Sequence, residues 1–138
     1  MRDVHRILGL SVAAVFLLVF IWGTAAWIRN RDPGPWFWRV VAFGQVGVVV
    51  QILIGLILYA RGGRPSDPLH YAYGLFPLLI LAVAHRSARR FQGLEWAVFA
   101  IAGLVIFGLM SRGFMTGMEI GASLGRLSVP GFGLKSPS

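Results

Sequence analysis

The 138-residue chain contains no cysteine and only five carboxylate side chains. Without cysteine it forms no disulfide and no thiolate metal site, and it has no cysteine nucleophile. The carboxylates lie at the ends of apolar runs or in the C-terminal segment, at Asp3, Asp32, Asp67, Glu95 and Glu119. Transporters and proton channels normally carry an acidic residue within the membrane, and hydrolases need paired carboxylates or a Ser-His-acid set. The sequence therefore favours a non-enzymatic role.

Charge is also scarce. Charged residues make up 13% of the chain and hydrophobic residues 57%, and the mean hydropathy is +0.72. A soluble domain of this size cannot cover so many apolar side chains. The net charge of +8 comes from short basic clusters between the apolar runs, where anionic lipid headgroups are nearer partners than nucleic-acid phosphates. These features indicate an integral membrane protein and disfavour nucleic-acid binding.

Four apolar runs predict transmembrane helices over residues 7–27, 40–60, 69–84 and 94–110. The connections between them are short and contain glycine and arginine, and the first two also contain proline. Short connections favour neighbouring antiparallel helices, and lipid demands helices whose backbone groups are satisfied internally. We therefore expect an all-α, integral membrane, four-helix up-down bundle over residues 1–112. Residues 113–138, rich in glycine and serine, are expected to form a C-terminal tail.

The second predicted helix carries small residues on one face, with Gly44, Gly47, Gln51 and Gly55 three or four positions apart. Such a face lets a neighbouring helix approach closely, so we expect it to point into the bundle, where ordinary helix packing explains it better than a ligand does.

The charge distribution does not predict which side of the membrane the termini occupy, because the arginines near the spans divide equally between the two sides.

Two of the three histidines occupy equivalent positions. His5 opens the first predicted helix and His70 the third, and in an alternating bundle these helices run in the same direction. Each histidine is followed four residues later by glycine, at Gly9 and Gly74, on the same helix face. A flat macrocycle held by an imidazole needs such a surface free of side chains. The pattern therefore predicts a b-type haem with His5 and His70 as axial iron ligands and the two glycines beside it.

A simpler interpretation of the same residues stays open. Histidine is common at membrane interfaces and glycine is common in transmembrane helices. His85 is predicted at the opposite end of the bundle beside Arg86 and Arg89, where a solvated basic loop explains it without a ligand.

Three short segments resemble one half of the heme A synthase (cytochrome oxidase assembly) family. They are VHRILG at residues 4–9, QVGVVVQILIG at residues 45–55, and LH at residues 69–70. In each half of that family, a helix start containing HR and a histidine two helices later flank a helix with a QxxLG-like pattern. His5 and His70 occupy those two histidine positions. The resemblance implies a haem-binding scaffold with both termini on the outer side and residues 28–39 and 85–95 in the cytoplasm.

The chain also departs from that family. The family carries a glutamate three residues before the first histidine, where this chain has Arg2, with Asp3 adjacent. Only one of the two halves is present, so one chain could not hold a substrate haem and a cofactor haem together. The resemblance therefore implies haem binding but does not extend to oxidation of a haem methyl group.

We expect a small protein of the cell inner (plasma) membrane that binds one haem b between His5 and His70. It would act in electron transfer or as a subunit of a redox complex, with lipid and other membrane subunits as partners. The alternative is a cofactor-free accessory subunit of a respiratory or photosynthetic membrane complex.

Overall fold

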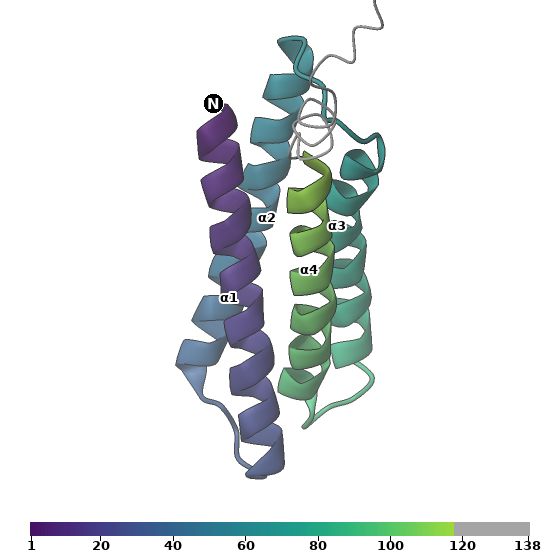
Figure 1. The fold of residues 1–138 in the computed structure, drawn as a ribbon. Coiled ribbons are helices and arrows are strands. Elements are labelled where there is room, and N and C mark those ends of the chain that lie inside the picture. The colour runs from purple at the N-terminus through teal and green to yellow at the C-terminus, as the bar shows by residue number, and fades with distance from the viewer. Residues whose placement is uncertain (118–138) are drawn as a thin grey trace, which may run out of the picture.

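The computed structural model describes residues 1–117 and consists there of four α-helices (Figure 1). They are α1 (Arg2–Ile28), α2 (Pro35–Ala60), α3 (Leu69–Ala88) and α4 (Glu95–Gly117). Successive helices run antiparallel, so the N-terminus lies at the same end of the bundle as the connection between α2 and α3. The predicted all-α, four-helix up-down bundle is confirmed.

Three helices, α1, α2 and α4, are long and apolar enough to cross a membrane by length and composition. α3 is not among them, because its apolar centre is shorter and both of its ends are polar. However, α3 starts at the end of the bundle where α2 finishes and finishes where α4 starts (Figure 1). If α1, α2 and α4 span the bilayer, α3 therefore has to cross it as well.

Carboxylates hold turns at the starts of three helices. The backbone N–H of Gly34 donates to Oδ1 of Asp32 at 2.6 Å, immediately before α2. The N–H of Leu69 donates to Oδ1 of Asp67 at 2.9 Å, and the N–H of Gly93 donates to Oε2 of Glu95 at 2.9 Å. Leu69 is the first residue of α3 and its N–H has no partner within the helix, whereas Gly34 and Gly93 precede α2 and α4, where the bonds close local turns. Three of the five acidic residues thus have a structural role.

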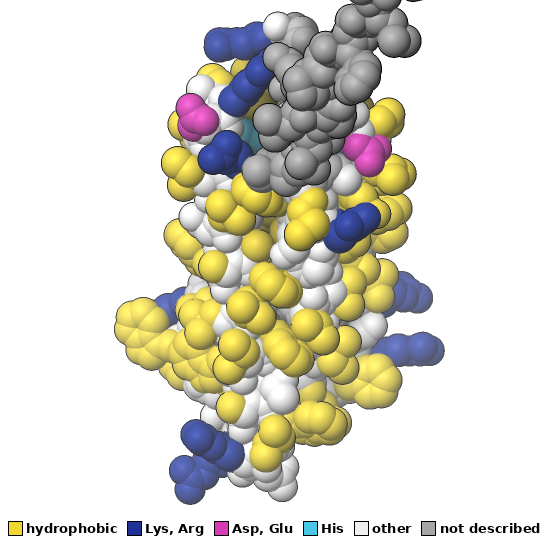
Figure 2. Space-filling view, in the orientation of Figure 1, with side chains coloured by type: hydrophobic (Ala, Val, Ile, Leu, Met, Phe, Trp, Pro, Cys, Tyr) yellow, Lys and Arg dark blue, Asp and Glu magenta, His cyan; other side chains and the backbone are white. Residues whose placement is uncertain are grey.

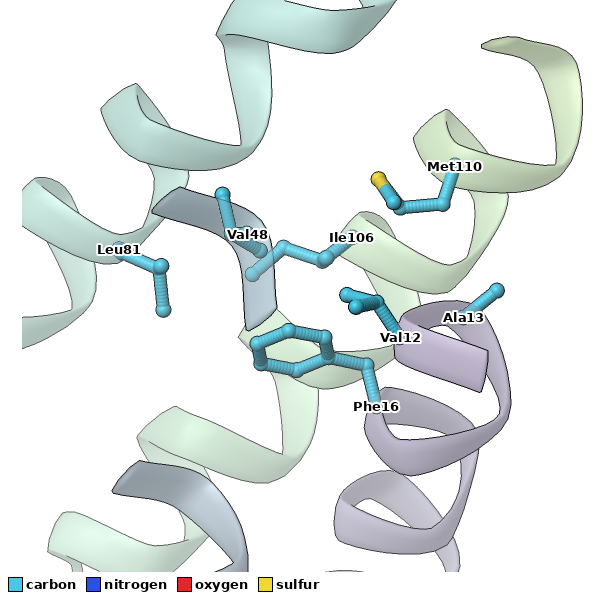
Figure 3. Packing of buried hydrophobic residues seen from close by; sticks show 7 residues of the cluster. All are labelled: Val12, Ala13, Phe16, Val48, Leu81, Ile106 and Met110. Carbon is cyan, nitrogen blue, oxygen red and sulfur yellow. The ribbon is translucent and has the colours of Figure 1, made fainter. Parts of the chain in front are cut away.

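The core consists of two apolar clusters stacked along the bundle axis. In the first, the ring of Phe16 from α1 lies against Val48 from α2 and Ile106 from α4 (Figure 3), and all three are essentially inaccessible to solvent. The second cluster lies toward the α1–α2 and α3–α4 connections and contains Val19, Phe37, Val41, Ala84, Phe99 and Ala102. All four helices contribute to this interior, which fixes their relative positions.

Glycines allow two close helix contacts. A Cβ atom at Gly47 of α2 would lie 2.7 Å from Cγ2 of Val12 in α1, and one at Gly103 of α4 would lie 2.8 Å from the carbonyl oxygen of Phe16. The small-residue face of α2 therefore packs against α1, as its spacing predicts. Small residues are the usual means by which helices approach closely in membranes.

Replacing Gly103 with leucine is expected to destabilise the bundle by about 1–3 kcal/mol, because the new side chain meets backbone atoms of α1 that cannot move aside. Gly108→Leu is the matched control on the same helix, since no atom lies within 4 Å of a Cβ placed there. Thermal unfolding in detergent, followed by circular dichroism, compares the two variants. Equal stability of both would show that the α1–α4 contact does not depend on Gly103.

Candidate functional site

A cavity of about 910 Å³ lies at the end of the bundle that carries the N-terminus. Its size is within the range of small-molecule and cofactor sites. His5 and Gly9 from α1 and His70 and Gly74 from α3 all line it. α2 and α4 complete its walls, with Gln51, Gly55, Met110, Gly113 and Gly117 among the lining residues. The structure thus brings the four residues singled out in the sequence to one cavity.

The rings of His5 and His70 lie close together in this cavity. Their centroids are 5.9 Å apart and their planes make an angle of 64°, an edge-to-face arrangement. With a metal–nitrogen bond of about 2.0–2.1 Å and a nitrogen lying ~1.2 Å from the ring centroid, two imidazoles on opposite sides of one metal ion have centroids about 6.4–6.6 Å apart. The rings would therefore have to move apart by about half an ångström, and turn toward a common axis, to serve as a pair of axial ligands.

The backbone of α4 sets the tautomer of His70. Nδ1 of this histidine lies 2.8 Å from the carbonyl oxygen of Gly113, which can only accept a hydrogen bond. Nδ1 therefore carries the proton, and Nε2 keeps its lone pair. A histidine that ligates a metal almost always donates its second ring N–H to a carbonyl or carboxylate in this way. The arrangement prepares Nε2 of His70 to act as a ligand.

A side chain from α2 orients His5. Nε2 of Gln51 donates to the carbonyl oxygen of His5 at 2.9 Å and lies 3.4 Å from Nε2 of the His5 ring, at the outer limit of a hydrogen bond. Among the described residues, Nδ1 of His5 and Oε1 of Gln51 are buried without a hydrogen-bond partner. Such atoms cost about 1–3 kcal/mol each and are rare in native interiors.

Glycines bring neighbouring helices against both rings. A Cβ at Gly55 of α2 would lie 3.3 Å from Cε1 of His5, and one at Gly117 of α4 would lie 2.9 Å from Cε1 of His70. No larger residue at these positions would leave the rings in place.

The two predicted glycines have different surroundings. No atom lies within 4 Å of a Cβ placed at Gly74, so this residue borders open space in the cavity. A Cβ at Gly9 would lie 2.9 Å from Nε2 of Gln51. The absence of a side chain at Gly9 therefore makes room for the amide that orients His5, and only Gly74 presents an unobstructed surface.

Positive charge surrounds the mouth of the cavity. Arg2, Arg6 and Arg64 are among its lining residues. Arg64 is held in place, because its guanidinium donates to the carbonyl oxygens of Tyr59 and Gly63, both at 3.0 Å, and lies 4.1 Å above the Tyr59 ring. Figure 2 shows part of a histidine side chain beside arginine or lysine side chains at this end. The mouth therefore suits a ligand that is anionic at one edge.

His85 is not part of this site. It lies near the end of α3 at the opposite end of the bundle, within the helix rather than in the predicted basic loop. Its Nδ1 lies 2.8 Å from the carbonyl oxygen of Leu81, one helical turn earlier. The separation from His5 and His70 agrees with the sequence-based exclusion of His85 as an axial ligand.

The sequence did not identify the residues that support the two histidines. Gly113 and Gly117 belong to the predicted tail, yet residues 113–117 form the end of α4; residues 118–138 lie outside the described residues. The four-residue spacing of Gly113 and Gly117 is the signal that could have placed them on one helix face. Gln51 was assigned to ordinary helix packing, and its contact with His5 was not foreseen.

The donor set restricts the kind of metal centre. No group of three or more His, Asp or Glu side chains that could hold a metal ion occurs within residues 1–117. Two imidazoles alone suit a metal whose remaining ligands come from a macrocycle.

The comparison with known proteins found no matching family model, curated protein or solved structure.

Proposed function

We propose that the protein binds one b-type haem in the membrane, with His5 and His70 as axial ligands, and serves in electron transfer or as a subunit of a redox complex. The observation that carries the proposal is the pair of imidazoles with centroids 5.9 Å apart, from α1 and α3, within a cavity of about 910 Å³. A haem held by two histidines supplies reversible one-electron chemistry.

Each surrounding residue has a defined task under this proposal. The carbonyl oxygen of Gly113 accepts the hydrogen bond from Nδ1–H of His70, which leaves the lone pair on Nε2. Gln51 holds the backbone of His5, and its weak contact with Nε2 of the ring could be exchanged for a metal ligand. Arg2 and Arg6 line the cavity and could pair with the carboxylates of a bound haem.

The outer surface fits a protein that resides among lipids and other membrane subunits. Large apolar side chains such as Phe43, Val46, Leu79 and Ile101 are each more than half exposed. Such exposure is unfavourable in water and ordinary in a bilayer. The same faces could contact further subunits of a redox complex, which would receive or supply the electron.

Haem titration of the purified protein tests the proposal. We expect saturation at one haem per chain, a low-spin b-type spectrum in the reduced state, and an electron paramagnetic resonance signal of two axial imidazoles in the oxidised state. Gln51→Leu removes the amide while keeping an apolar side chain of similar size, and we expect it to weaken binding without abolishing it. A linear, non-saturating titration would contradict haem binding and favour the cofactor-free accessory subunit.

For topology we expect both termini, and hence the haem, on the outer side of the plasma membrane. The expectation is based on the family resemblance and on the compact cluster of Arg86, Arg89 and Arg90, which resists translocation. Single cysteines introduced into this cysteine-free chain report its membrane topology directly. In spheroplasts, a membrane-impermeant maleimide should label Ser66→Cys in the α2–α3 connection and not Gln92→Cys in the α3–α4 connection. The reverse pattern would place His5 and His70 on the cytoplasmic side.

A further inference from the structure

A second cavity, of about 760 Å³, lies at the end of the bundle opposite His5 and His70, and we call it the distal cavity. It is formed by α2, α3 and α4 together with the α1–α2 and α3–α4 connections. Its lining combines aromatic rings with uncharged hydrogen-bonding groups and a few charges, namely Asp32, Trp38, Val41, Ala42, Gln45, His85, Ala88, Arg89, Gln92, Glu95, Trp96 and Phe99. None of these residues takes part in the proposed haem site.

His85 provides the distal cavity with a hydrogen-bond acceptor. Its Nδ1 donates to the carbonyl oxygen of Leu81 at 2.8 Å, so the neutral ring carries its lone pair on Nε2. The ring packs edge-to-face on Phe99, with centroids 5.0 Å apart and an interplanar angle of 87°. Both contacts fix the ring orientation. A hydroxyl group on a bound molecule could therefore donate to Nε2 of His85.

Two amides provide hydrogen-bond donors. Gln45 from α2 and Gln92 from the α3–α4 connection both line the distal cavity, and an amide NH2 group donates to acceptor oxygens. The indole nitrogen of Trp96, in contrast, is closed off from the cavity, because it has essentially no accessible surface. The distal cavity thus suits a ligand that both donates and accepts hydrogen bonds.

The remaining walls favour a flat ligand without a negative charge. Trp38 packs edge-to-face on Phe99, with centroids 5.4 Å apart, which gives the cavity a rigid aromatic side. The charged lining residues are two carboxylates, Asp32 and Glu95, and one guanidinium, Arg89. Both carboxylates already accept backbone N–H groups, and together they oppose an anionic lipid headgroup.

The bundle is least tightly closed on the side where this ligand would enter. Among neighbouring helices, α2 and α3 make the smallest contact. Each of these helices contributes a small residue to the lining of the distal cavity, Ala42 from α2 and Ala88 from α3. A molecule dissolved in the bilayer could reach the cavity laterally and leave an apolar tail among the lipids.

We infer that the distal cavity binds the head group of a membrane-soluble para-hydroquinone, the reduced form of a quinone carrying an apolar tail. Its aromatic ring would pack beside Trp38 and Phe99, one hydroxyl would donate to Nε2 of His85, and the oxygen atoms would accept from the amides of Gln45 and Gln92. The inference concerns binding alone and does not depend on the proposed haem.

Binding of a decyl-substituted para-hydroquinone to the full chain in lipid nanodiscs tests the inference, with empty nanodiscs subtracted. The matched ligand is its dimethyl ether, which has the same ring and tail but donates no hydrogen bond. We expect the wild type to bind the hydroquinone about tenfold more tightly than the ether, since one hydrogen bond distinguishes them. His85→Phe keeps an aromatic ring beside Phe99 and should abolish this preference.

A second pair of variants separates the cavity from the lipid. Ala42→Phe adds a ring to the lining of the distal cavity and should weaken saturable binding of both ligands. Val46→Phe adds the same ring one helical turn away, at an exposed position outside the lining, and should leave binding unchanged. His5→Ala should likewise bind the hydroquinone normally. Equal affinity for the two ligands in the wild type, or normal binding by Ala42→Phe, would overturn the inference.

Discussion

His5→Ala and His70→Ala are each expected to abolish the low-spin b-type spectrum of the haem-loaded protein, whereas His85→Ala retains it. The low-spin state requires both axial imidazoles, and the two rings lie close together with centroids 5.9 Å apart. His85 lines the distal cavity at the other end of the bundle and cannot reach the same iron. Absorption spectra of the three reduced variants, at matched protein concentration, provide the measurement.

Free imidazole distinguishes the loss of a ligand from the loss of the fold. An alanine at position 5 or 70 leaves space for one imidazole molecule, so adding imidazole to either variant should restore most of the low-spin spectrum. A variant that has merely unfolded would not respond. If His85→Ala loses the spectrum to the same extent as the other two variants, the assignment of the axial pair is wrong.

The sequence was sufficient to predict which histidines share one end of the bundle. That arrangement depends only on the number of helices between His5 and His70 and on their alternating direction, and both follow from the lengths of the apolar runs. The inward face of α2 was also predictable, because Gly44 and Gly47 recur at helical spacing. These features depend on local pattern and connectivity.

The contacts that orient the histidines could not be predicted in the same way. The Gly113–His70 hydrogen bond requires α4 to continue beyond Met110, where the predicted span ended because Ser111 and Arg112 are polar. Hydropathy marks the edge of the hydrocarbon core, but a helix has no physical reason to stop there. The Gln51–His5 contact depends on how α1 and α2 are rotated about their axes, which tertiary packing decides.

The distal cavity shows the same limitation. His85 was assigned to a solvated basic loop because it stands beside Arg86 and Arg89 in the sequence. In the structure His85 belongs to α3, and Trp96 from the start of α4 lines the same cavity. Residues this far apart in the chain share a site only through the packing of α2, α3 and α4, which no local pattern encodes.

Gly74→Leu is expected to lower haem occupancy at least tenfold while leaving the bundle folded. Gly74 lines the cavity between the histidines, and no atom lies within 4 Å of a Cβ placed there. The leucine side chain therefore enters space that the macrocycle would use and meets no protein atom that it must displace. Haem content per chain, measured as the pyridine haemochrome, gives the occupancy, and circular dichroism reports the fold.

Gly108→Leu makes the comparison decisive, because Gly108 also has no atom within 4 Å of its Cβ position but does not line the cavity. Both substitutions add the same side chain to a helix and raise helix propensity equally. We expect Gly108→Leu to bind haem like the wild type. Full haem content in Gly74→Leu would mean that the macrocycle does not lie along this face of α3, even if His5 and His70 are its ligands.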